Sequence, residues 1–500
     1  MNEKEDVDKS KKTESTEAPV KKTCCPSFSN CFSGRKSIVI VVFLAVLLDN
    51  VLLTTIVPIV PRLLEDDLRR ESGNITSQHL NETNEDGDEH IKIGIMFAIK
   101  PLVQLLSNPF IGPITNRIGY SIPMFTGLLI LFISTLVFAF ATNYYLLLTA
   151  RGIQGLGSAC STVSGMGMLA TYFIDEVERG RAFAFALSGL AIGVLIGAPY
   201  GGILFQFISK EAPFLILAGL TAVNGIIQLI TLKPKVSREN QKGSSITELL
   251  KDPYILVAAG SITIGNLSIA ILEPTLPSWM KKTMNSEEWQ QGTAFLPASI
   301  SYLIGANIFG PVSYKIGRGN SAGLGLVING ICLIGLPFSK RVEHLIAPMI
   351  ALGFAIGMVD SSMMPLMGHL VDLRHTAVYG SVYAIADVAF CVGFVFGPLL
   401  STAMLKVLGF NWMLWVIAII SFAYAPLTLF LRKQSKSDMP LEILACQSDD
   451  RRASNPDCSF YHTTAQNNFF NNYNKYDDYA FHHLIKRRES PQTSSSLQDY

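Results

Sequence analysis

Six ionisable side chains of this 500-residue chain lie inside long apolar stretches. Four are acids and two are bases: Asp49, Glu273, Asp360, Asp387, Lys100 and Arg151. A charge at the centre of a bilayer costs at least about 2.5 kcal/mol on insertion scales, so such residues are usually functional. Because two bases cannot neutralise four acids, some of the acids must bind a proton or another mobile cation. This imbalance predicts the exchange of an organic cation for protons.

Asp49 shows the pattern most clearly, because it lies in the middle of the apolar stretch 37–61, next to Asn50. A carboxylate at this depth is expected to meet a cation, which is a proton, a substrate or a buried basic side chain. The other interpretation is a structural ion pair that only holds helices together. We favour the functional interpretation, since a residue without a function could be replaced by leucine.

Aromatic and amide side chains occur in the same apolar stretches. They are Phe97, Asn266, Trp279, Phe295, Tyr302, Tyr383 and Phe394. The face of an aromatic ring attracts an ammonium group by roughly 0.5–2 kcal/mol, depending on how far the pair is desolvated. Each ring taken alone is more often a packing or lipid-facing residue, so only the combination with the acids indicates an ammonium ligand.

Several classes of function are excluded. The sequence has no nucleotide-binding loop, no cluster of metal ligands and no nucleophile paired with a base. We therefore expect no enzyme activity, no metal and no cofactor. The net charge of +1 gives no electrostatic reason to expect a nucleic-acid partner. His369 and His375 are interpreted as bystanders near the end of a predicted span.

Twelve apolar stretches are long enough to span a membrane and to position these side chains. Their predicted bounds are 37–61, 91–112, 121–141, 144–168, 182–207, 212–232, 253–280, 292–315, 321–338, 345–368, 377–404 and 411–431. With 49% hydrophobic and 16% charged residues, the composition fits an all-α membrane protein. Lysine and arginine gather between the spans on one side, which predicts that this side is cytoplasmic. An even number of spans places the tails 1–36 and 433–500, both expected to be disordered, on that side.

Two sequence patterns recur at nearly one spacing. The segment 112–119, GPITNRIG, recurs in part at 310–317, an offset of 198 residues. The segment 193–197, GVLIG, recurs as GFVFG at 393–397, an offset of 200 residues. The repeat predicts two six-helix bundles, 37–232 and 253–432, joined by a cytoplasmic linker at 233–252. This plan resembles the parallel repeats of the major facilitator superfamily, which hold their site between the halves near the membrane midplane.

Two motifs resemble the same superfamily. The segment 112–119 has Asn116 where an aspartate is usual, and its Arg117 is expected to act in gating by reaching an acid or a helix end. The segment 189–202 has glycine at every fourth position, which gives a smooth face for close helix packing. It resembles an antiporter motif and favours antiport over facilitated diffusion.

The segments outside the spans carry signals for modification and sorting. The loop 62–90 contains glycosylation sequons at Asn74 and Asn81, which fit a lumenal or extracellular face. Three cysteines precede the first span, where S-palmitoylation is an option: Cys24, Cys25 and Cys31. Residues 438–444 resemble a dileucine signal for sorting adaptors. No cysteine falls in a loop on the far side of the membrane, so we expect no structural disulfide.

The segment 353–398 resembles the vesicular amine transporter family. It contains GFAIGMVDSSMMP at 353–365 and VYGSVYAIAD at 378–387, and FLPASISYLIG at 295–305 adds to the match. These runs are closer to the monoamine branch of the family than to the acetylcholine branch. The resemblance covers about residues 37–432 and implies a twelve-helix transporter, which we expect to be a monomer.

The resemblance also implies roles for single residues. The amine-binding positions are Asp49, Asn50, Asn266, Glu273, Phe295, Tyr302 and Asp360. The positions for proton coupling are Lys100, Arg151, Glu273, Asp360 and Asp387, with Lys100 and Asp387 as a pair that bridges the second and eleventh spans. Phe97, Trp279 and Phe295 match aromatic residues of a lumenal gate.

The sequence departs from the family pattern at three places. Phe394 stands where the family has a tyrosine in the eleventh span. A lumenal cysteine pair of the family is missing, and Asn285 lies near the position of one of these cysteines. The loop 62–90 is also short. With these departures, the sequence resembles an invertebrate member of the family.

The resulting hypothesis is a proton-coupled antiporter that loads cytoplasmic monoamines into acidic secretory or synaptic vesicles. Three alternatives stay open: a vesicular acetylcholine transporter, a plasma-membrane multidrug/proton antiporter, and a receptor or scaffold that transports nothing. The surplus of buried acids argues against the last of these.

Overall fold

The computed structural model describes residues 35–56, 59, 82–141, 143–232, 244–375 and 378–435. The described residues are helical with short connections, and no strand occurs among them. The sequons at Asn74 and Asn81, the cysteines of the N-terminal tail, and the sorting signal at 438–444 lie outside these ranges. The helices considered below belong to one compact unit that ends at Phe430, except for the last five residues of the final helix, 431–435.

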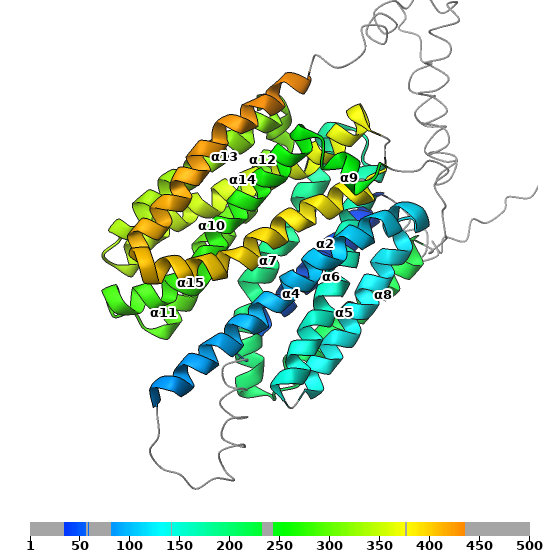
Figure 1. Cartoon of the computed structure of the whole chain (residues 1–500). Coiled ribbons are helices and arrows are strands. Elements are labelled where there is room, and N and C mark those ends of the chain that lie inside the picture. Colours follow the sequence, from blue (N-terminus) through cyan, green and yellow to red (C-terminus); the bar gives the residue numbers. More distant parts are fainter. Residues whose placement is uncertain are drawn as a thin grey trace, which may run out of the picture. The chain divides into compact units, whose positions relative to one another are not determined.

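Six long helices make up the first half of this unit (Figure 1). They are α2 (Arg35–Thr55), α4 (Glu82–Ile118), α5 (Ser121–Phe140), α6 (Tyr144–Tyr172), α7 (Glu176–Phe207) and α8 (Ala212–Leu232). Helix α4 begins at Glu82, inside the segment predicted to be a loop. The second half contains short α9 (Ile246–Leu249), α10 (Pro253–Met284), short α11 (Glu288–Thr293), α12 (Leu296–Ile316), α13 (Arg318–Gly335), η1 (Leu336–Phe338), α14 (Val342–Arg374), α15 (Gly380–Tyr424) and η2 (Ala425–Ser435).

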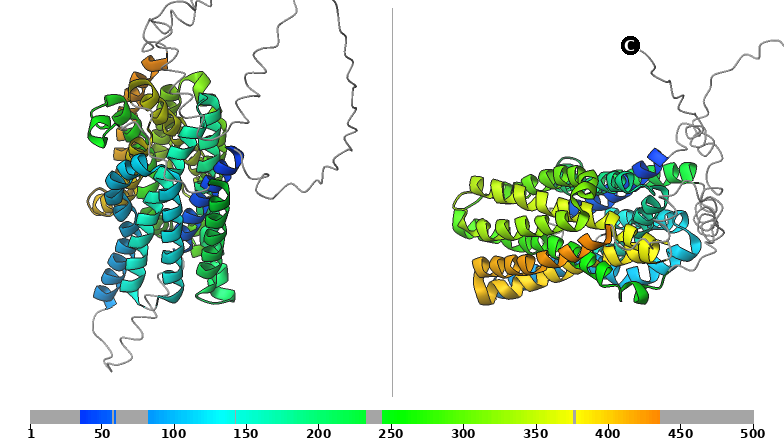
Figure 2. Two further views of the ribbon diagram at one scale, coloured as in Figure 1. Left: turned by 90° about the vertical axis from the view of Figure 1, so that its right-hand side faces the viewer. Right: turned by 90° about the horizontal axis from the view of Figure 1, so that it is seen from above.

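Eleven helical segments of the described chain are long and apolar enough to cross a membrane. Helix α15 supplies two of them, Gly380–Ser401 and Ala403–Leu431, and Gly409 in the second has a positive φ of 77° that kinks the helix. Helix α6 is the twelfth long segment, and its 29 residues would extend about 43 Å. It is less apolar because it carries Arg151 and many glycines and serines. The long helices run along a common direction (Figure 2), and the predicted all-α membrane fold is confirmed.

The predicted glycine face of the antiporter-like motif packs against α2. A Cβ atom at Gly193 would lie 2.8 Å from the carbonyl oxygen of Leu47, and one at Gly197 would lie 2.7 Å from that of Val51. The equivalent glycine of the second half, Gly397, lies against α10, where a Cβ would come within 2.6 Å of the Ala270 Cβ. The sequence repeat therefore corresponds to a repeated close helix contact, α7 on α2 and α15 on α10.

The two halves meet along the pairs α4–α15 and α7–α12. Helices α4 and α15 lie side by side between the halves (Figure 1). The backbones approach closely at Gly380, where a Cβ would lie 2.7 Å from the carbonyl oxygen of Gly112. Gly310 approaches the backbone of Gly180 in the same way, at 2.7 Å. Gly112 lies near the end of α4 that carries Arg117, and Gly310 lies at the equivalent repeat position near the end of α12, so the halves are tightly packed at this end of the interface.

Candidate transport site

The carboxylate of Asp49 is held by three side chains from two other helices. The Lys100 ammonium of α4 lies 2.9 Å from Oδ2, and the Ser158 hydroxyl of α6 donates to Oδ1 over 2.7 Å. The Gln154 amide also donates to Oδ1, over 3.2 Å. Asp49 is 7% exposed and Lys100 is 5% exposed, so the pair is shielded from water. Adjacent Asn50 donates to the carbonyl of Val46 in its own helix.

Arg151 continues this network away from Asp49. It is fully buried, and its guanidinium donates to the Gln154 Oε1 over 2.7 Å and to the Leu53 carbonyl over 3.2 Å. Its Nε has no partner among the described residues. Gln154 and Ser158 were not singled out from the sequence. They could have been found, because they follow Arg151 by three and seven residues and so share its helix face.

Asp387 is held by amides instead of a base. Gln104 Nε2 donates to both carboxylate oxygens, over 3.0 and 2.8 Å, and Asn108 Nδ2 donates to Oδ2 over 2.7 Å. The pairing of Lys100 with Asp387 that the family resemblance implies is therefore not the one present. Lys100 points to Asp49, and the amides one and two turns further along α4 satisfy Asp387.

Asp360 forms the second acidic centre, in the other half of the protein. It is fully buried, and it accepts hydrogen bonds from the Asn266 amide and the Tyr302 hydroxyl, each over 3.1 Å. These three residues come from α14, α10 and α12, so the structure brings together three positions that the sequence predicted separately.

Glu273 differs from the other three membrane-embedded acids. It lies seven residues after Asn266 on α10, which places both residues on one helix face. Its side chain is exposed, and it forms no hydrogen bond or ion pair within the described part of the chain. A carboxylate without a partner in the middle of a membrane-spanning helix is free to bind a cation.

The predicted gating aromatics lie on α4, on α10 and in the turn that precedes α12. Trp279 stacks on Phe410 with ring centroids 4.5 Å apart, and half-buried Phe295 packs against the same apolar cluster. Phe97 is half-buried and precedes Lys100 by three residues on α4. Tyr383 lies elsewhere, stacked on Phe183 with its hydroxyl donating to the Met364 carbonyl.

Ion pairs between the halves reinforce the closed end. Buried Arg179 of α7 donates to Asp372 of α14 over 2.7 Å, and the Tyr379 hydroxyl donates to the same carboxylate. Burial and the Asp372 charge raise the pKa of Tyr379 above its ordinary value, so its hydroxyl remains a donor. Sequence reasoning missed Arg179 and Asp372, because a charge near a span end usually indicates only orientation.

Glu176 joins the halves at a second point. It pairs with Arg318 at 3.4 Å and with His369 at 3.0 Å. His375, like His369, makes a structural contact, because it lies 3.2 Å from Asp252 within the second half.

Arg117, the predicted gating arginine, is exposed and makes no ion pair with a described residue. The neighbouring Asn116 makes the contact instead, because its amide donates to the Ser381 hydroxyl of the other half over 2.8 Å. The motif at 112–119 thus lies at the interface between the halves, where Asn116 and not Arg117 makes the side-chain contact.

Two six-helix halves with acids buried at mid-helix are the arrangement of a transporter of the major facilitator type. The Major Facilitator Superfamily pattern matches residues 38–379 and 261–447. The human organic anion transporter MFSD10 (TETRAN) has the same fold, with a TM-score of 0.62 and 16% identity over 79% of this chain and 98% of that one.

Named relatives are much more similar in sequence. The synaptic vesicular amine transporter of Rattus norvegicus is 50% identical over 82% of this chain and 91% of its own length. The chromaffin granule amine transporter of the same species is 48% identical over 82% and 90%. The vesicular acetylcholine transporter of Torpedo torpedo is 40% identical over 80% and 82%. The chain belongs to the vesicular amine transporter family and is a transporter, not an enzyme.

Proposed function

We propose that the protein is a proton-coupled antiporter that loads cytoplasmic monoamines, such as serotonin and dopamine, into acidic secretory or synaptic vesicles. The higher identity to the amine transporters than to the acetylcholine transporter supports a monoamine. A protonated monoamine can donate hydrogen bonds to a carboxylate, which a quaternary ammonium cannot.

The observation that carries this proposal is the distribution of counter-charges around the membrane-embedded acids. Asp49 has the Lys100 ammonium, whereas Asp360 and Asp387 accept hydrogen bonds only from neutral groups among the described residues. Exposed Glu273 has no partner there either. A carboxylate buried like those of Asp360 and Asp387, without a basic partner, is stable only when it binds a proton or another cation. Protons and amines are therefore alternative ligands of the same acids.

Lys100 couples the proton sites to the amine site in this scheme. Its ammonium occupies Asp49, a position that an amine substrate requires. When Asp387 gives up its proton, its carboxylate attracts the Lys100 ammonium. Lys100 then moves away from Asp49, and Asp49 is free to bind the amine. When Asp387 is protonated again, Lys100 returns to Asp49 and displaces the amine.

The closed end is the cytoplasmic end in this scheme, which makes the structure a lumen-facing state. Protons from the acidic lumen load onto Glu273, Asp360 and Asp387 and weaken their hold on the amine. The neutralised site then reorients, and protons leave to the cytoplasm. Each pH unit of gradient supplies about 1.4 kcal/mol per proton, so coupling to more than one proton steepens accumulation.

The outer segments complete the proposal. Asn74 and Asn81 are glycosylated in the lumen, both tails are cytoplasmic, and the C-terminal tail binds sorting adaptors. The transporter acts as a monomer, because each half supplies its own acidic centre.

Uptake by proteoliposomes with an acidic interior tests the function. We expect concentrative uptake of labelled serotonin and dopamine that collapses when an ionophore removes the pH gradient, and little uptake of acetylcholine. Acetylcholine uptake equal to that of serotonin and dopamine would contradict the proposal. Amine uptake that does not depend on the pH gradient would also contradict it. Labelling the native protein distinguishes a vesicle transporter from a plasma-membrane multidrug antiporter.

A further inference from the structure

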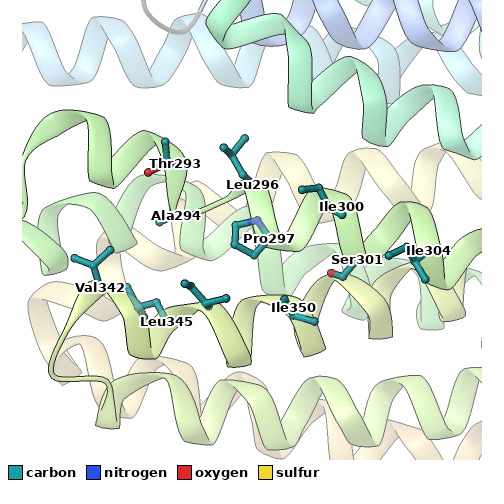
Figure 3. A pocket seen from close by; sticks show the side chains of 11 residues that line it. Thr293, Ala294, Leu296, Pro297, Ile300, Ser301, Ile304, Val342, Leu345 and Ile350 are labelled. Carbon is teal, nitrogen blue, oxygen red and sulfur yellow. The ribbon is translucent and has the colours of Figure 1, made fainter.

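An apolar groove lies on the second half of the protein, away from the acidic centres. It has a volume of about 510 Å³ and runs between α12 and α14 (Figure 3). Its walls are aliphatic, with Leu296, Pro297, Ile300 and Ile304 on one side and Val342, Leu345, Ile346 and Ile350 on the other. Its two hydroxyls are occupied, because Thr293 donates to the Gln290 carbonyl and Ser301 to the Ala298 carbonyl. The groove therefore suits a purely apolar ligand.

The groove opens on the exposed outer surface of two candidate membrane spans. Ile300 and Ile304 of α12 are 48% and 50% exposed, and Ile346 and Ile350 of α14 are 47% and 46% exposed. Beside the groove, the two helices touch through their backbones, because a Cβ at Gly357 would lie 2.5 Å from the Tyr302 carbonyl oxygen. Both helices are candidate spans, so an acyl chain is the apolar group that this face meets.

A second, polar pocket continues from the end of the groove. Its volume is about 520 Å³, and it shares Thr293 and Val342 with the groove. The charged residues of its lining are two bases and two acids: Lys340, Arg341, Glu287 and Glu343. This balance matches a headgroup that carries both charges, with its phosphate on the bases and its ammonium on the acids.

We propose that the groove and the polar pocket together bind one zwitterionic glycerophospholipid of the phosphatidylethanolamine type. One acyl chain fills the groove, and the headgroup occupies the polar pocket. A primary ammonium donates hydrogen bonds to the carboxylates, which the methylated ammonium of phosphatidylcholine cannot do. The net negative headgroup of phosphatidylglycerol would lack the ammonium group that these two carboxylates attract.

The lipid site borders the helix that carries part of the transport site. Ser301 lines the groove, and the next residue on α12, Tyr302, donates to Asp360. A bound acyl chain thus packs against α12 next to the residue that contacts Asp360. Any effect of the lipid on uptake rests on the proposed function, whereas lipid binding itself does not.

Native mass spectrometry of the full-length protein tests the site without amine or proton gradient. The protein is first reconstituted in bilayers with equal parts of phosphatidylethanolamine, phosphatidylcholine and phosphatidylglycerol, and then released into detergent. We expect one retained phosphatidylethanolamine per protein. Equal retention of the three lipids, or preferred retention of phosphatidylglycerol, would overturn the proposal.

Two independent sets of variants locate the bound lipid. Ile300→Trp with Ile346→Trp fills the groove and should reduce retention by about tenfold or more, whereas Ile331→Trp on lipid-facing α13 should not. Lys340→Glu with Arg341→Glu removes the phosphate partners and should also reduce retention, whereas Lys282→Glu, exposed outside both pockets, should not. Unchanged retention in both double variants would place the lipid elsewhere and contradict the proposal. Since no transport is measured, this outcome is separate from failure of the antiport proposal.

Discussion

The ammonium of Lys100 lies 2.9 Å from Asp49 Oδ2 in the interior of the first half, where both side chains are almost fully buried. The pair joins α2 to α4, and Ser158 and Gln154 of α6 complete the coordination of the carboxylate. A base thus neutralises Asp49, the first membrane-embedded acid of the chain, while Asp360 and Asp387 have only neutral donors among the described residues. The account of transport depends on this difference.

Removing one member of the pair should cost more stability than removing both. We expect Lys100→Met to destabilise the protein by about 3–5 kcal/mol, because it leaves a buried carboxylate uncompensated. Lys100→Met combined with Asp49→Asn should recover most of this loss. Thermal unfolding of the purified protein in detergent measures both. If the double variant is no more stable than Lys100→Met alone, the ion pair does not stabilise this conformation.

The donors to Asp360 should set the affinity for the amine. Tyr302→Phe removes one hydroxyl and should raise the KM for serotonin uptake about 5- to 30-fold, corresponding to roughly 1–2 kcal/mol. Tyr314→Phe is the matched control, because Tyr314 is an exposed tyrosine of the same helix. Equal KM values for the two variants would show that the Tyr302 hydroxyl does not contribute to amine binding.

The ion pair between Arg179 and Asp372 should hold the closed end together. Asp372→Asn leaves a buried guanidinium without its carboxylate partner, so the closed state should become less populated. A cysteine at Ser381, which is 1% exposed at this interface, reports the change through labelling by a membrane-impermeant maleimide. Labelling should rise several-fold in Asp372→Asn and stay low in Asp175→Asn, an exposed helix cap that asparagine also satisfies. Identical labelling in both would contradict a gating role for the pair.

The glycine face of α7 should tolerate no side chain. Gly193→Ala places a Cβ 2.7 Å from the Asn50 Cβ and 2.8 Å from the Leu47 carbonyl oxygen, so we expect a loss of about 1–3 kcal/mol of stability. Gly219→Ala, where a Cβ has open space, should be neutral or slightly stabilising. A thermal unfolding comparison distinguishes the two, and a fully stable Gly193→Ala variant would be inconsistent with the packing described.

Much of the architecture could be predicted from the sequence, because apolar length and repeated glycines are local properties. The duplicated segments at 193–197 and 393–397 correspond to the two close contacts of α7 with α2 and of α15 with α10. Helix α6 was also among the predicted spans, at 144–168, although its arginine, glycines and serines make it less apolar than the other long helices.

The partners of the charged residues could not be predicted in the same way. Lys100, Gln104 and Asn108 share one face of α4, and which of them reaches Asp387 depends on the placement of α2 and α15 around that face. Arg179 and His369 make contacts between the halves that exist only when this end of the protein is closed. The sequence does not indicate which end is closed in a given conformation.

Proton movement during amine uptake tests the central claim most directly. Proteoliposomes with an acidic interior and a trapped pH dye are given serotonin, and wild type is compared with Asp360→Asn and with the surface control Asp175→Asn. The account predicts that serotonin drives proton release in wild type and in the control, and that Asp360→Asn loses both this release and concentrative uptake. Undiminished coupled proton release and uptake in Asp360→Asn would contradict it.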